Sequence, residues 1–432
     1  MDIQEIYSIY LKHPNLSTDS RLIPENSIFF ALKGGNFNGN QYAQQAIEKG
    51  ASYAIIDEPE FAISEKFIVV DNVLQTLQKL ARFHRDQLNI PIIGITGTNG
   101  KTTTKELTAA ILAKKFKVDF TQGNLNNHIG VPLTLLSMNS QTEIGVVEMG
   151  ANHPGEIAEL CEIANPDFGL ITNIGKAHLE GFGSFQGVKK TKAELYRFIE
   201  KKRGKIFLNS DNPYLVDEIG RNETITYSPK GKHGATLMGE FVNAAPFLNF
   251  KAFFPKGWLY LTTLLVGSYN LENAMAATCV GFYFGVDPLK IQEALKQYSP
   301  TNNRSQLIKT GKNEVLMDAY NANPTSMIAA IENFASINNK IEKVFILGDM
   351  LELGEVSAEE HQHIVQILEK HSSDMVILVG KHFSATSSSE RLLKFESSNE
   401  LKDYLKNHPL HGKFILMKGS RGIRIETILE LL

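Results

Sequence analysis

The sequence is poor in cysteine and has no excess of basic residues. Its 432 residues include two cysteines, Cys161 and Cys279, which lie far apart and form no CxxC pair. This usage argues against a disulfide framework and indicates a reducing compartment. The 44 basic and 47 acidic residues give a formal net charge of −3. No polybasic surface follows from that balance, so nucleic acid is not a favoured partner.

Long apolar runs are absent as well. No run is long enough to span a bilayer. The first residues, MDIQEIYSIYLKHPN, include early acidic residues and no apolar core, unlike a signal peptide. We therefore expect a soluble, cytoplasmic protein without membrane insertion. A chain of 432 residues exceeds what one core accommodates, so two or three domains are expected.

The clearest chemical motif is PIIGITGTNGKTTTKEL at residues 91–107. A β-branched apolar run leads into a glycine turn, Gly97 to Gly100, then Lys101-Thr102, and then apolar residues at helical spacing. This is the context of a P-loop, whose backbone N–H groups face phosphate while the lysine reaches the terminal phosphates and the threonine holds Mg²⁺. The P-loop consensus has glycine at the position that Ile95 occupies in this chain. The alternative is a strand–turn–helix whose Gly-Lys pair is accidental.

Polar residues follow two further strands that the sequence predicts. Glu148 follows the strand 144–147, and His178 lies beyond the strand 168–172. Ligand groups gather at the carboxyl ends of strands in an open parallel sheet, and a carboxylate there is a natural Mg²⁺ ligand. The alternatives are a solvated strand end and a structural histidine. Residues 189–194, KKTKAE, are expected to open a helix with a solvated lysine face.

The order of predicted elements indicates an α/β protein of three domains. Residues 1–85 form a small α/β domain. Residues 86–298 form a central P-loop domain with a parallel sheet and an antiparallel excursion at 229–265. Residues 299–432 alternate strands and helices as a Rossmann-like domain.

The last of these domains has no GxGxxG after its first strand, so a dinucleotide site is not supported. Polar clusters follow three of its strands instead, at 318–324, 348–350 and 418–421. They predict a site that faces the middle domain.

Ten motifs spread along the whole chain resemble those of the Mur ligases, the ATP-dependent amide ligases of peptidoglycan synthesis. They are TDSR, TGTNGKTTTKE, NLNNHIGVPLTLL, VVEMGANHPGEI, TNIGKAHLEGFGS, KTKAEL, GSYNLENAMAA, DAYNANPTSM, LGDMLELGE and MKGSR. Each is weakly specific, but their number and order argue strongly against coincidence. The YNANPTS segment resembles the members that add D-alanyl-D-alanine to UDP-N-acetylmuramoyl-tripeptide.

The resemblance implies an ATP site, a Mg²⁺ site and a catalytic set. Lys101, Glu148, His178 and Lys192 would be catalytic. The same Glu148, His178 and Lys192, with Thr102, would hold Mg²⁺, Lys192 as a carbamate formed from its neutral amine and CO₂. ATP would be bound by the P-loop residues Thr96, Gly97, Thr98, Asn99, Gly100, Lys101 and Thr102, by Asn270 and Asn273 beside adenine, and by Arg304 and Asp318 on closure of the C-terminal domain.

The resemblance also places the substrates. Ser20 and Arg21 would bind the uridine-nucleotide end of UDP-N-acetylmuramoyl-tripeptide, although the local pattern alone favours an ordinary turn there. The muramyl-peptide would meet Asn126, Asn127 and His128, and further substrate contacts would come from Tyr320, Asn321 and Asn323. Asn270 has helix capping as its alternative role. The family commonly has His where this chain has Tyr269, which we expect to stack against adenine; a monomer is expected.

Three other functions compete with this interpretation. Another member of the superfamily, such as the ligase that adds the third residue or a folylpolyglutamate synthase, is the nearest, and Asp211-Asn212-Pro213 resembles a motif of the diaminopimelate-adding relatives in the wrong domain. A P-loop switch that hydrolyses ATP belongs to a different class, but it gives no reason for LNNHIGVP. A catalytically dead scaffold is disfavoured because the implied catalytic residues are all present. Whether the third tripeptide residue is diaminopimelate or lysine is left open.

Overall fold

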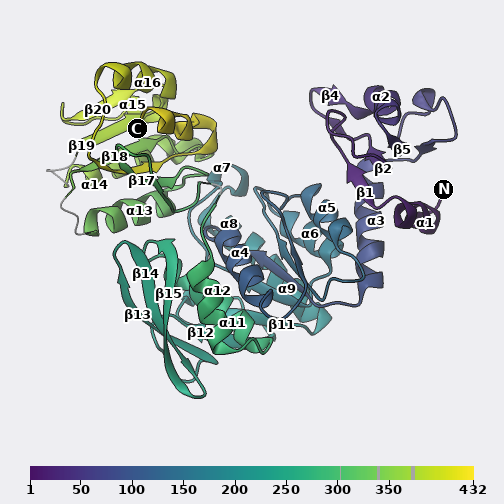
Figure 1. Ribbon diagram of the computed structural model, residues 1–432, viewed down its shortest axis with the longest axis horizontal. Coiled ribbons are helices and arrows are strands. Elements are labelled where there is room, and N and C mark those ends of the chain that lie inside the picture. The colour runs from purple at the N-terminus through teal and green to yellow at the C-terminus, as the bar shows by residue number, and fades with distance from the viewer. Residues whose placement is uncertain (302, 338–340, 371–374) are drawn as a thin grey trace. The chain divides into compact units, whose positions relative to one another are not determined.

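The computed structural model of the protein describes residues 1–301, 303–337, 341–370 and 375–432 (Figure 1). By its internal contacts the chain divides into two compact units. The first comprises residues 1–95, 116–151 and 155–169, and the second comprises 96–115, 152–154 and 170–432. Both units mix helices with sheets, which confirms the predicted α/β class. Within the described ranges, no helix combines the length and apolarity that a bilayer crossing needs.

A four-stranded parallel sheet opens the first unit. In spatial order its strands are β1 (Asn15–Ser17), β2 (Ser27–Phe30), β5 (Ala51–Ile56) and β6 (Phe67–Val69). Every residue of β2 is buried, as expected for a parallel strand covered on both faces. The other elements of this region are α1 (Ile3–Lys12), the hairpin of β3 (Lys33–Gly34) and β4 (Phe37–Asn38), α2 (Ala43–Glu48) and α3 (Val73–Leu88).

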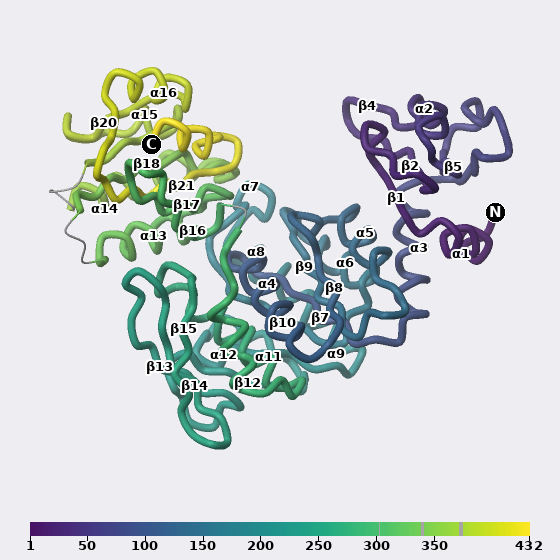
Figure 2. The backbone as a smooth tube through the Cα atoms, viewed as in Figure 1, coloured from purple at the N-terminus to yellow at the C-terminus, as the bar shows by residue number. Residues whose placement is uncertain are grey.

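Three more parallel strands of the first unit form a ladder that includes the strand before the predicted P-loop. Their spatial order is β7 (Ile92–Thr96), β9 (Ile144–Glu148) and β8 (Val118–Phe120). In the chain, α5 (Gly130–Ser137) follows β8 and α6 (Glu156–Ala164) follows β9 (Figure 2). In the β7–β9 register Ile95 pairs with Glu148. The carboxyl end of β9 therefore lies level with the residues that lead into the glycine turn.

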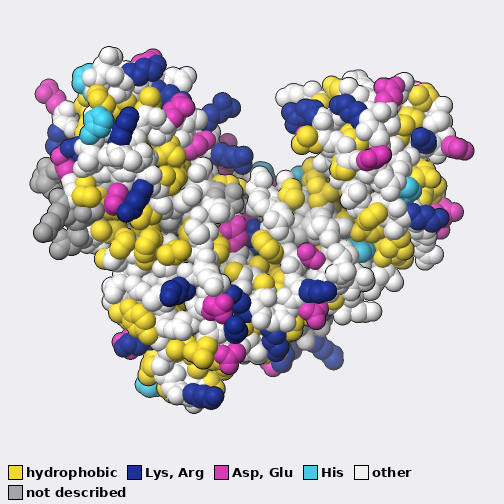
Figure 3. Space-filling view, viewed as in Figure 1, with side chains coloured by type: hydrophobic (Ala, Val, Ile, Leu, Met, Phe, Trp, Pro, Cys, Tyr) yellow, Lys and Arg dark blue, Asp and Glu magenta, His cyan; other side chains and the backbone are white. Residues whose placement is uncertain are grey.

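The second unit carries the P-loop helix, α4 (Lys101–Leu112), and a run of six strands. The strands are β10 (Phe168–Ile171), β11 (Lys205–Asn209), β12 (Glu223–Ser228), β13 (Leu237–Ala244), β14 (Phe247–Phe254) and β15 (Gly257–Val266). The ladder from β11 to β13 is parallel, and β13, β14 and β15 pair antiparallel, which confirms the predicted excursion. Hydrophobic side chains reach the surface over these last strands, at the lower left of Figure 3.

Six further helices of the second unit precede the C-terminal sheet in the chain. They are α7 (Leu179–Phe182), α8 (Phe185–Lys192), α9 (Glu194–Lys202), α10 (Pro213–Val216), α11 (Asn270–Tyr283) and α12 (Pro288–Gln297). The prediction that KKTKAE opens a helix is wrong for its lysines, which end α8, and only its last residue, Glu194, begins a helix, α9. Ser184 caps α8 by accepting the Gly187 N–H, so the lysines fall in its last turn, where the helix dipole favours cations.

The C-terminal sheet has six strands in the order β16 (Gln306–Lys309), β17 (Glu314–Asp318), β21 (Phe414–Lys418), β18 (Lys343–Gly348), β19 (Met375–Val379) and β20 (Leu392–Phe395). β16 pairs antiparallel and the others are parallel, in agreement with the predicted Rossmann-like alternation. The register pairs Asp318 with Lys418. The helices are α13 (Pro324–Ser336), α14 (Ser357–Leu368), α15 (Lys381–Ser384) and α16 (Ser398–Asn407).

A buried histidine of α14 shapes the loop after β18. The His361 side chain is fully buried, its Nδ1 lies 2.7 Å from the Ser357 carbonyl, and its Nε2 lies 3.0 Å from the Met350 N–H. These partners select the neutral ring, because Nδ1 donates and Nε2 accepts. Burial lowers the pKa of His361 below its ordinary 6.5.

That lowered pKa predicts an acid-sensitive fold. Below about pH 6.5 the unfolded chain binds a proton that the folded chain resists, so stability is full above that pH and falls as the pH drops toward the folded pKa. We expect the free energy of unfolding of the wild type to fall further between pH 7.5 and 5.5 than that of His361→Gln, by at most about 1.4 kcal/mol per pH unit. Thermal denaturation at a series of pH values measures this difference. Replacement of the exposed His363 by Gln is the control and should leave the pH dependence of stability unchanged. An equal dependence of stability on pH in the wild type and His361→Gln would contradict the prediction.

Candidate active site

The glycine turn before α4 has a shape that only glycine allows. Gly97 has φ +142°, and a Cβ there would lie 2.0 Å from the Thr172 hydroxyl oxygen and 3.0 Å from the Thr172 backbone nitrogen. Gly100 has φ +77°, and its Cβ would lie 2.2 Å from Asn273 Oδ1. L side chains rarely adopt such φ values. The turn is therefore packed closely from both sides by other polar groups.

Hydrogen bonds hold the predicted P-loop in one conformation. The Thr98 N–H donates to the Asn173 carbonyl at 3.0 Å, and the Thr172 hydroxyl donates to the Asn99 carbonyl at 2.6 Å. Lys101 folds back over the turn, with its Nζ donating to the Gly97 carbonyl at 2.8 Å and to the Thr98 carbonyl at 3.1 Å. The loop thus brings together the residues from Thr96 to Thr102 that the sequence assigned to ATP.

The start of α4 fits an anionic ligand. The N-cap residue Gly100 has no side chain to cap the helix, and Thr102 is buried in its first turn. The first N–H groups of a helix and its dipole favour a phosphate at that position. The loop can therefore bind a phosphate through backbone N–H groups and the helix N-terminus, as other P-loops do.

Replacing Gly97 by Ala tests the close packing of the turn. The new Cβ would meet backbone and hydroxyl atoms that have no room to move, so we expect a loss of about 1–3 kcal/mol in stability, together with weaker ATP binding. Thermal denaturation and nucleotide titration measure the two effects. Gly183→Ala is the matched control, because Gly183 also has a positive φ, +71°, but open space around its Cβ position. If both variants lose the same stability, strain alone and not packing governs the turn.

His178 and Lys192 lie on neighbouring short helices. His178 has φ +49° and forms the N-cap of α7, and its Nδ1 pairs with the Glu352 carboxylate. That hydrogen bond lowers the pKa of Glu352. Lys192 ends α8 with 2% exposure, and its Nζ lies 5.2 Å from the centre of the Phe182 ring. Both predicted metal ligands are thus held in place by residues that the sequence did not single out.

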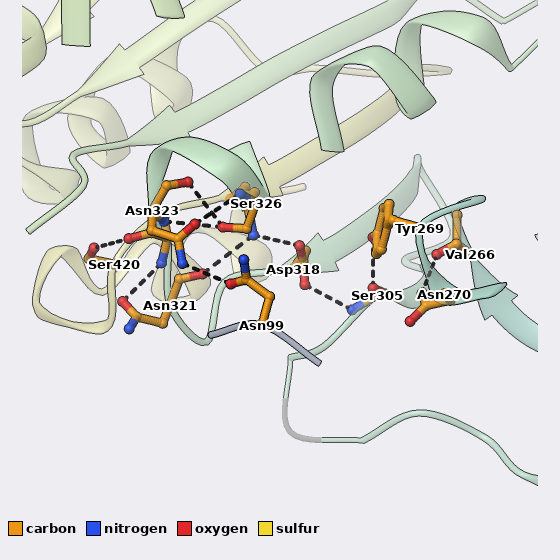
Figure 4. A network of polar contacts seen from close by, with 12 residues as sticks. Asn99, Val266, Tyr269, Asn270, Ser305, Asp318, Asn321, Asn323, Ser326 and Ser420 are labelled. Carbon is orange, nitrogen blue, oxygen red and sulfur yellow. Dashed lines mark hydrogen bonds and ion pairs between the residues drawn. The ribbon is translucent and has the colours of Figure 1, made fainter. Parts of the chain in front are cut away.

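The start of α11 carries the two asparagines assigned to the adenine region. Asn273 Nδ2 donates to Asn270 Oδ1 at 2.9 Å, and the Thr104 hydroxyl donates to Asn273 Oδ1 at 3.2 Å. Asn270 Nδ2 donates to the Val266 carbonyl at 2.8 Å (Figure 4). Asn270 therefore does not cap α11, whose N-cap is Tyr269. The structure places the Asn273 side chain against Thr104 of the P-loop helix and joins Asn270 to Asn273, while a contact of either residue with adenine stays a prediction.

The residues predicted at the strand ends of the C-terminal sheet cluster together. Lys418 Nζ lies 2.6 Å from Asp318 Oδ2, and Asp318 Oδ1 accepts the Ser305 N–H at 3.2 Å. The Arg304 guanidinium lies 3.7 Å from the centre of the Tyr320 ring, a cation–π contact. The polar residues Asp318, Tyr320 and Lys418 that follow strands thus lie close together, and Arg304 from the segment before β16 joins them, while contacts of Arg304 and Asp318 with ATP stay a prediction.

One hydrogen bond joins this cluster to the P-loop. Asn323 Nδ2 donates to Asn99 Oδ1 at 2.8 Å, and Figure 4 shows the two side chains pointing toward each other. Asn323 also caps α13 by accepting the Ser326 N–H at 2.9 Å. Asn321 is exposed and its side chain accepts the Ala322 N–H at 2.9 Å, so it does not share the contact. The YNANPTS segment and the predicted P-loop are therefore direct neighbours.

The remaining candidates belong to the first unit. Glu148 is buried at the end of β9 and accepts a hydrogen bond from Asn126 Nδ2 at 2.7 Å. Asn127 Oδ1 accepts the N–H of Gly130, the first residue of α5, at 2.9 Å, and the exposed His128 follows Asn127. The loop 126–128 is thus tied at one end to the predicted metal ligand Glu148.

Ser20 and Arg21 form part of a turn, as their local pattern predicts. The Arg21 guanidinium pairs with Asp19 at 2.7 Å and holds the pKa of that carboxyl at about 2. The Arg21 side chain is 86% exposed. The turn accounts for the polar residues at these positions, and a role of Ser20 and Arg21 in binding the uridine nucleotide stays a prediction.

The residue types that the resemblance assigns to Mg²⁺ suit this ion. The hydroxyl of Thr102 and the carboxylate of Glu148 are oxygen ligands of the kind that this ion takes. Across the ranges that the structure describes, no three His, Cys, Asp or Glu residues are grouped as a metal site. The set expected from the sequence mixes a hydroxyl, one carboxylate, one imidazole and a carbamate, and is not such a group. The assignment of these four residues to Mg²⁺ stays a prediction.

Three residues that contact predicted site residues were given no individual role in the sequence analysis, although one of them, Lys418, belongs to the predicted polar cluster 418–421. Lys418, Glu352 and Ser305 each contact a predicted residue. Lys418 lies in the motif MKGSR and Glu352 in the motif LGDMLELGE, so these motifs indicated that the two residues lie near the site. No local pattern signals Ser305, which precedes an edge strand.

Three family descriptions match separate parts of the chain. The Mur ligase middle domain matches residues 95–281, the Mur ligase glutamate ligase domain matches 303–421, and the catalytic domain of the Mur ligase family matches 14–85. A UDP-N-acetylmuramoyl-tripeptide--D-alanyl-D-alanine ligase of Bacillus subtilis (strain 168) is 35% identical over 429 residues, which cover 96% of this chain and 92% of that relative. The chain belongs to the Mur ligase family. The resemblance of its ten motifs is thereby confirmed.

Solved structures of Mur ligases share the fold. A MurF crystal structure from Acinetobacter baumannii has a TM-score of 0.86 at 30% identity and covers 96% of this chain and 92% of its own. A MurF ligase from Thermotoga maritima, in complex with ADP, has a TM-score of 0.85 at 28% identity and covers 98% and 97%. This Mur ligase therefore has the three-domain fold of the family, while the exact boundaries after residues 85 and 298 stay a prediction.

Proposed function

We propose that this Mur ligase joins D-alanyl-D-alanine to UDP-N-acetylmuramoyl-tripeptide by an amide bond, with ATP converted to ADP and phosphate. The observation that carries the proposal is the hydrogen bond between Asn99 of the P-loop and Asn323 of the YNANPTS segment. It joins the loop suited to phosphate with the segment expected to meet the dipeptide. The full-length similarity to relatives that bear the name of this activity supports the same reaction.

The reaction proceeds in two steps. An oxygen of the terminal tripeptide carboxylate attacks the γ-phosphorus of ATP, and ADP leaves. The D-alanyl-D-alanine amine then attacks the acyl phosphate and loses a proton, and phosphate departs from the tetrahedral intermediate with the carboxylate oxygen. A free carboxylate is a poor acceptor for an amine, whereas the acyl phosphate supplies a good leaving group.

The residues of the chain mainly bind and orient the substrates and neutralise the negative charge of the phosphates. Lys101 leaves its two loop carbonyls to meet the terminal phosphates, while the N–H groups at the start of α4 hold the phosphate chain. Arg304, held face-on to Tyr320, adds a fixed positive charge near the transferring group. When bound, Mg²⁺ offsets negative charge on the phosphates, and Thr102, Glu148, His178 and Lys192 as a carbamate would hold it. Positioning of this kind lowers the activation barrier by roughly 7–11 kcal/mol.

Substrate binding follows the same division of the chain. We propose that Ser20 and Arg21 meet the uridine nucleotide, that the loop 126–128 meets the muramyl-peptide, and that Tyr320, Asn321 and Asn323 meet the dipeptide side. The exposure of the Arg21, Asn127 and His128 side chains leaves them accessible to a ligand. We further propose that the protein acts as a monomer in the cytoplasm, where its nucleotide-linked substrate is made.

The test is phosphate release from ATP and Mg²⁺ with the tripeptide substrate and D-alanyl-D-alanine supplied singly and together. We expect release with both substrates only, together with UDP-N-acetylmuramoyl-pentapeptide by mass spectrometry. Tripeptides that end in diaminopimelate and in lysine are compared to identify the third residue. Release that is independent of both substrates would overturn the proposal in favour of a P-loop switch. A product formed from single amino acids in place of the dipeptide would favour another Mur-type ligase.

A further inference from the structure

Two hydroxyl groups join the helix α11 to the segment that enters the C-terminal sheet. The Tyr269 hydroxyl lies 2.9 Å from the Ser305 hydroxyl, as Figure 4 shows. Tyr269 directly precedes α11, and Ser305 directly precedes β16. Burial raises the pKa of Tyr269, so its hydroxyl stays neutral and able to donate at physiological pH. The contact therefore links two parts of the chain that have no strand pairing at these residues.

The tyrosine side of this contact is fixed by close packing. A Cβ at Gly267, where φ is +102°, would lie 2.4 Å from the Tyr269 ring, so the ring rests directly on the backbone. The next residue, Asn270, is tied to the Val266 carbonyl at 2.8 Å. The Tyr269 hydroxyl is thus presented from a rigid turn.

The serine side is fixed by charge. The Ser305 N–H donates to Asp318 at 3.2 Å, and the buried Lys418 holds Asp318 at 2.6 Å. Ser305 itself has φ +48° and Asn303 has φ +57°. Residues other than glycine occupy this left-handed region only when surrounding contacts determine it. The segment before β16 thus takes a shape that its contacts impose.

Functional groups lie at both ends of this chain of contacts. On the α11 side, Asn270 leads through Asn273 to Thr104 of the P-loop helix. On the other side, Arg304 directly precedes Ser305 and stacks on Tyr320. Any shift of Ser305 therefore moves Arg304 relative to the nucleotide-binding end of α11.

We propose that Tyr269 is a positioning residue whose hydroxyl, through Ser305 and Asp318, sets the place of Arg304 relative to bound ATP. The inference rests on the proposed function, since the role of Arg304 is part of it. Tyr269 acts on the transferring phosphoryl group through other residues. Its loss is expected to affect turnover more than the initial binding of nucleotide, because the P-loop remains intact.

The test compares Tyr269→Phe, Ser305→Ala and the double variant with Tyr260→Phe, which removes an exposed tyrosine hydroxyl from β15. Loss of one hydrogen bond corresponds to a roughly 3–10-fold effect. We expect each single variant to lower kcat for pentapeptide formation by about that factor, with ADP affinity changed less than about twofold. The double variant should be no slower than either single one, because both remove the same contact. Tyr260→Phe should match the wild type.

Two results would overturn the inference. One is a Tyr269→Phe kcat equal to that of Tyr260→Phe, and the other is a double variant whose losses multiply. Hydrogen exchange of the backbone at residues 303–307 supplies a readout that does not depend on turnover, and Tyr269→Phe should accelerate it. Failure of the proposed function is seen separately, because wild type and Tyr260→Phe would then make no pentapeptide, while the exchange comparison still tests the contact.

Discussion

Replacing Lys101 by Met is expected to lower kcat for ATP-dependent phosphate release by roughly 10³-fold or more, the scale seen when a preorganised charge at a phosphoryl or acyl transfer site is removed. Lys101 lies in the first turn of α4 with its Nζ on the carbonyls of Gly97 and Thr98. Its ammonium group therefore lies over the glycine turn, where the proposed function places the phosphates of ATP. Methionine keeps the length and much of the volume of the side chain but removes the charge.

The control for this variant is Lys114→Met. Lys114 lies just beyond the end of α4 and pairs with Glu293 at 3.1 Å on the surface. Surface pairs of this kind contribute little, so the control should keep wild-type turnover and a nearly unchanged melting temperature. Rates are measured with both substrates saturating, because a weaker affinity would otherwise be mistaken for a slower step. A Lys101→Met enzyme within tenfold of the wild type would remove Lys101 from the catalytic set.

Replacing Lys192 by Ala is expected to lower kcat by roughly 10²-fold, because the loss of a group that orders a metal site commonly costs 10–100-fold or more. Lys192 is 2% exposed at the end of α8 and lies against the Phe182 ring. A lysine so deeply buried is unusual unless its amine is paired or chemically modified. The proposed carbamate would convert the amine into an oxygen ligand.

The Lys192 prediction has a readout that a merely structural role would not give. If the side chain carries a carbamate, small carboxylic acids such as acetate should restore part of the activity of Lys192→Ala, since they supply the missing oxygen. Incubation of the wild type with ¹³C-bicarbonate should give a carbamate carbon signal that Lys192→Ala lacks. The exposed Lys190→Ala is the matched control. Full activity of Lys192→Ala, or an identical ¹³C signal in both proteins, would contradict the assignment.

Local sequence predicted those parts of the site whose shape is determined locally. The P-loop is an example, because Gly97 and Gly100 occupy backbone conformations that other residues rarely adopt. The buried strand β7 before it and the helix α4 after it follow from apolar periodicity. The ends of β9 and β17 likewise carried the residues that the α/β sheet rule predicts there.

Contacts between distant segments were not predictable in this way. The Asn99–Asn323 and His178–Glu352 contacts join residues that the chain separates widely, and no periodicity encodes such a pairing. The Asp318–Lys418 pair depends on the parallel register of β17 with β21, which only the folded sheet reveals. The lysine run was misplaced because Ser184, the cap that starts α8, was not recognised.

Transfer of ¹⁸O tests the central claim most directly. The tripeptide substrate is labelled with ¹⁸O in its terminal carboxylate and incubated with ATP, Mg²⁺ and D-alanyl-D-alanine. The account predicts one ¹⁸O atom in each phosphate released, because the carboxylate oxygen that attacks the γ-phosphorus leaves with the phosphate. Unlabelled phosphate would contradict it, since water would then be the group that attacks ATP.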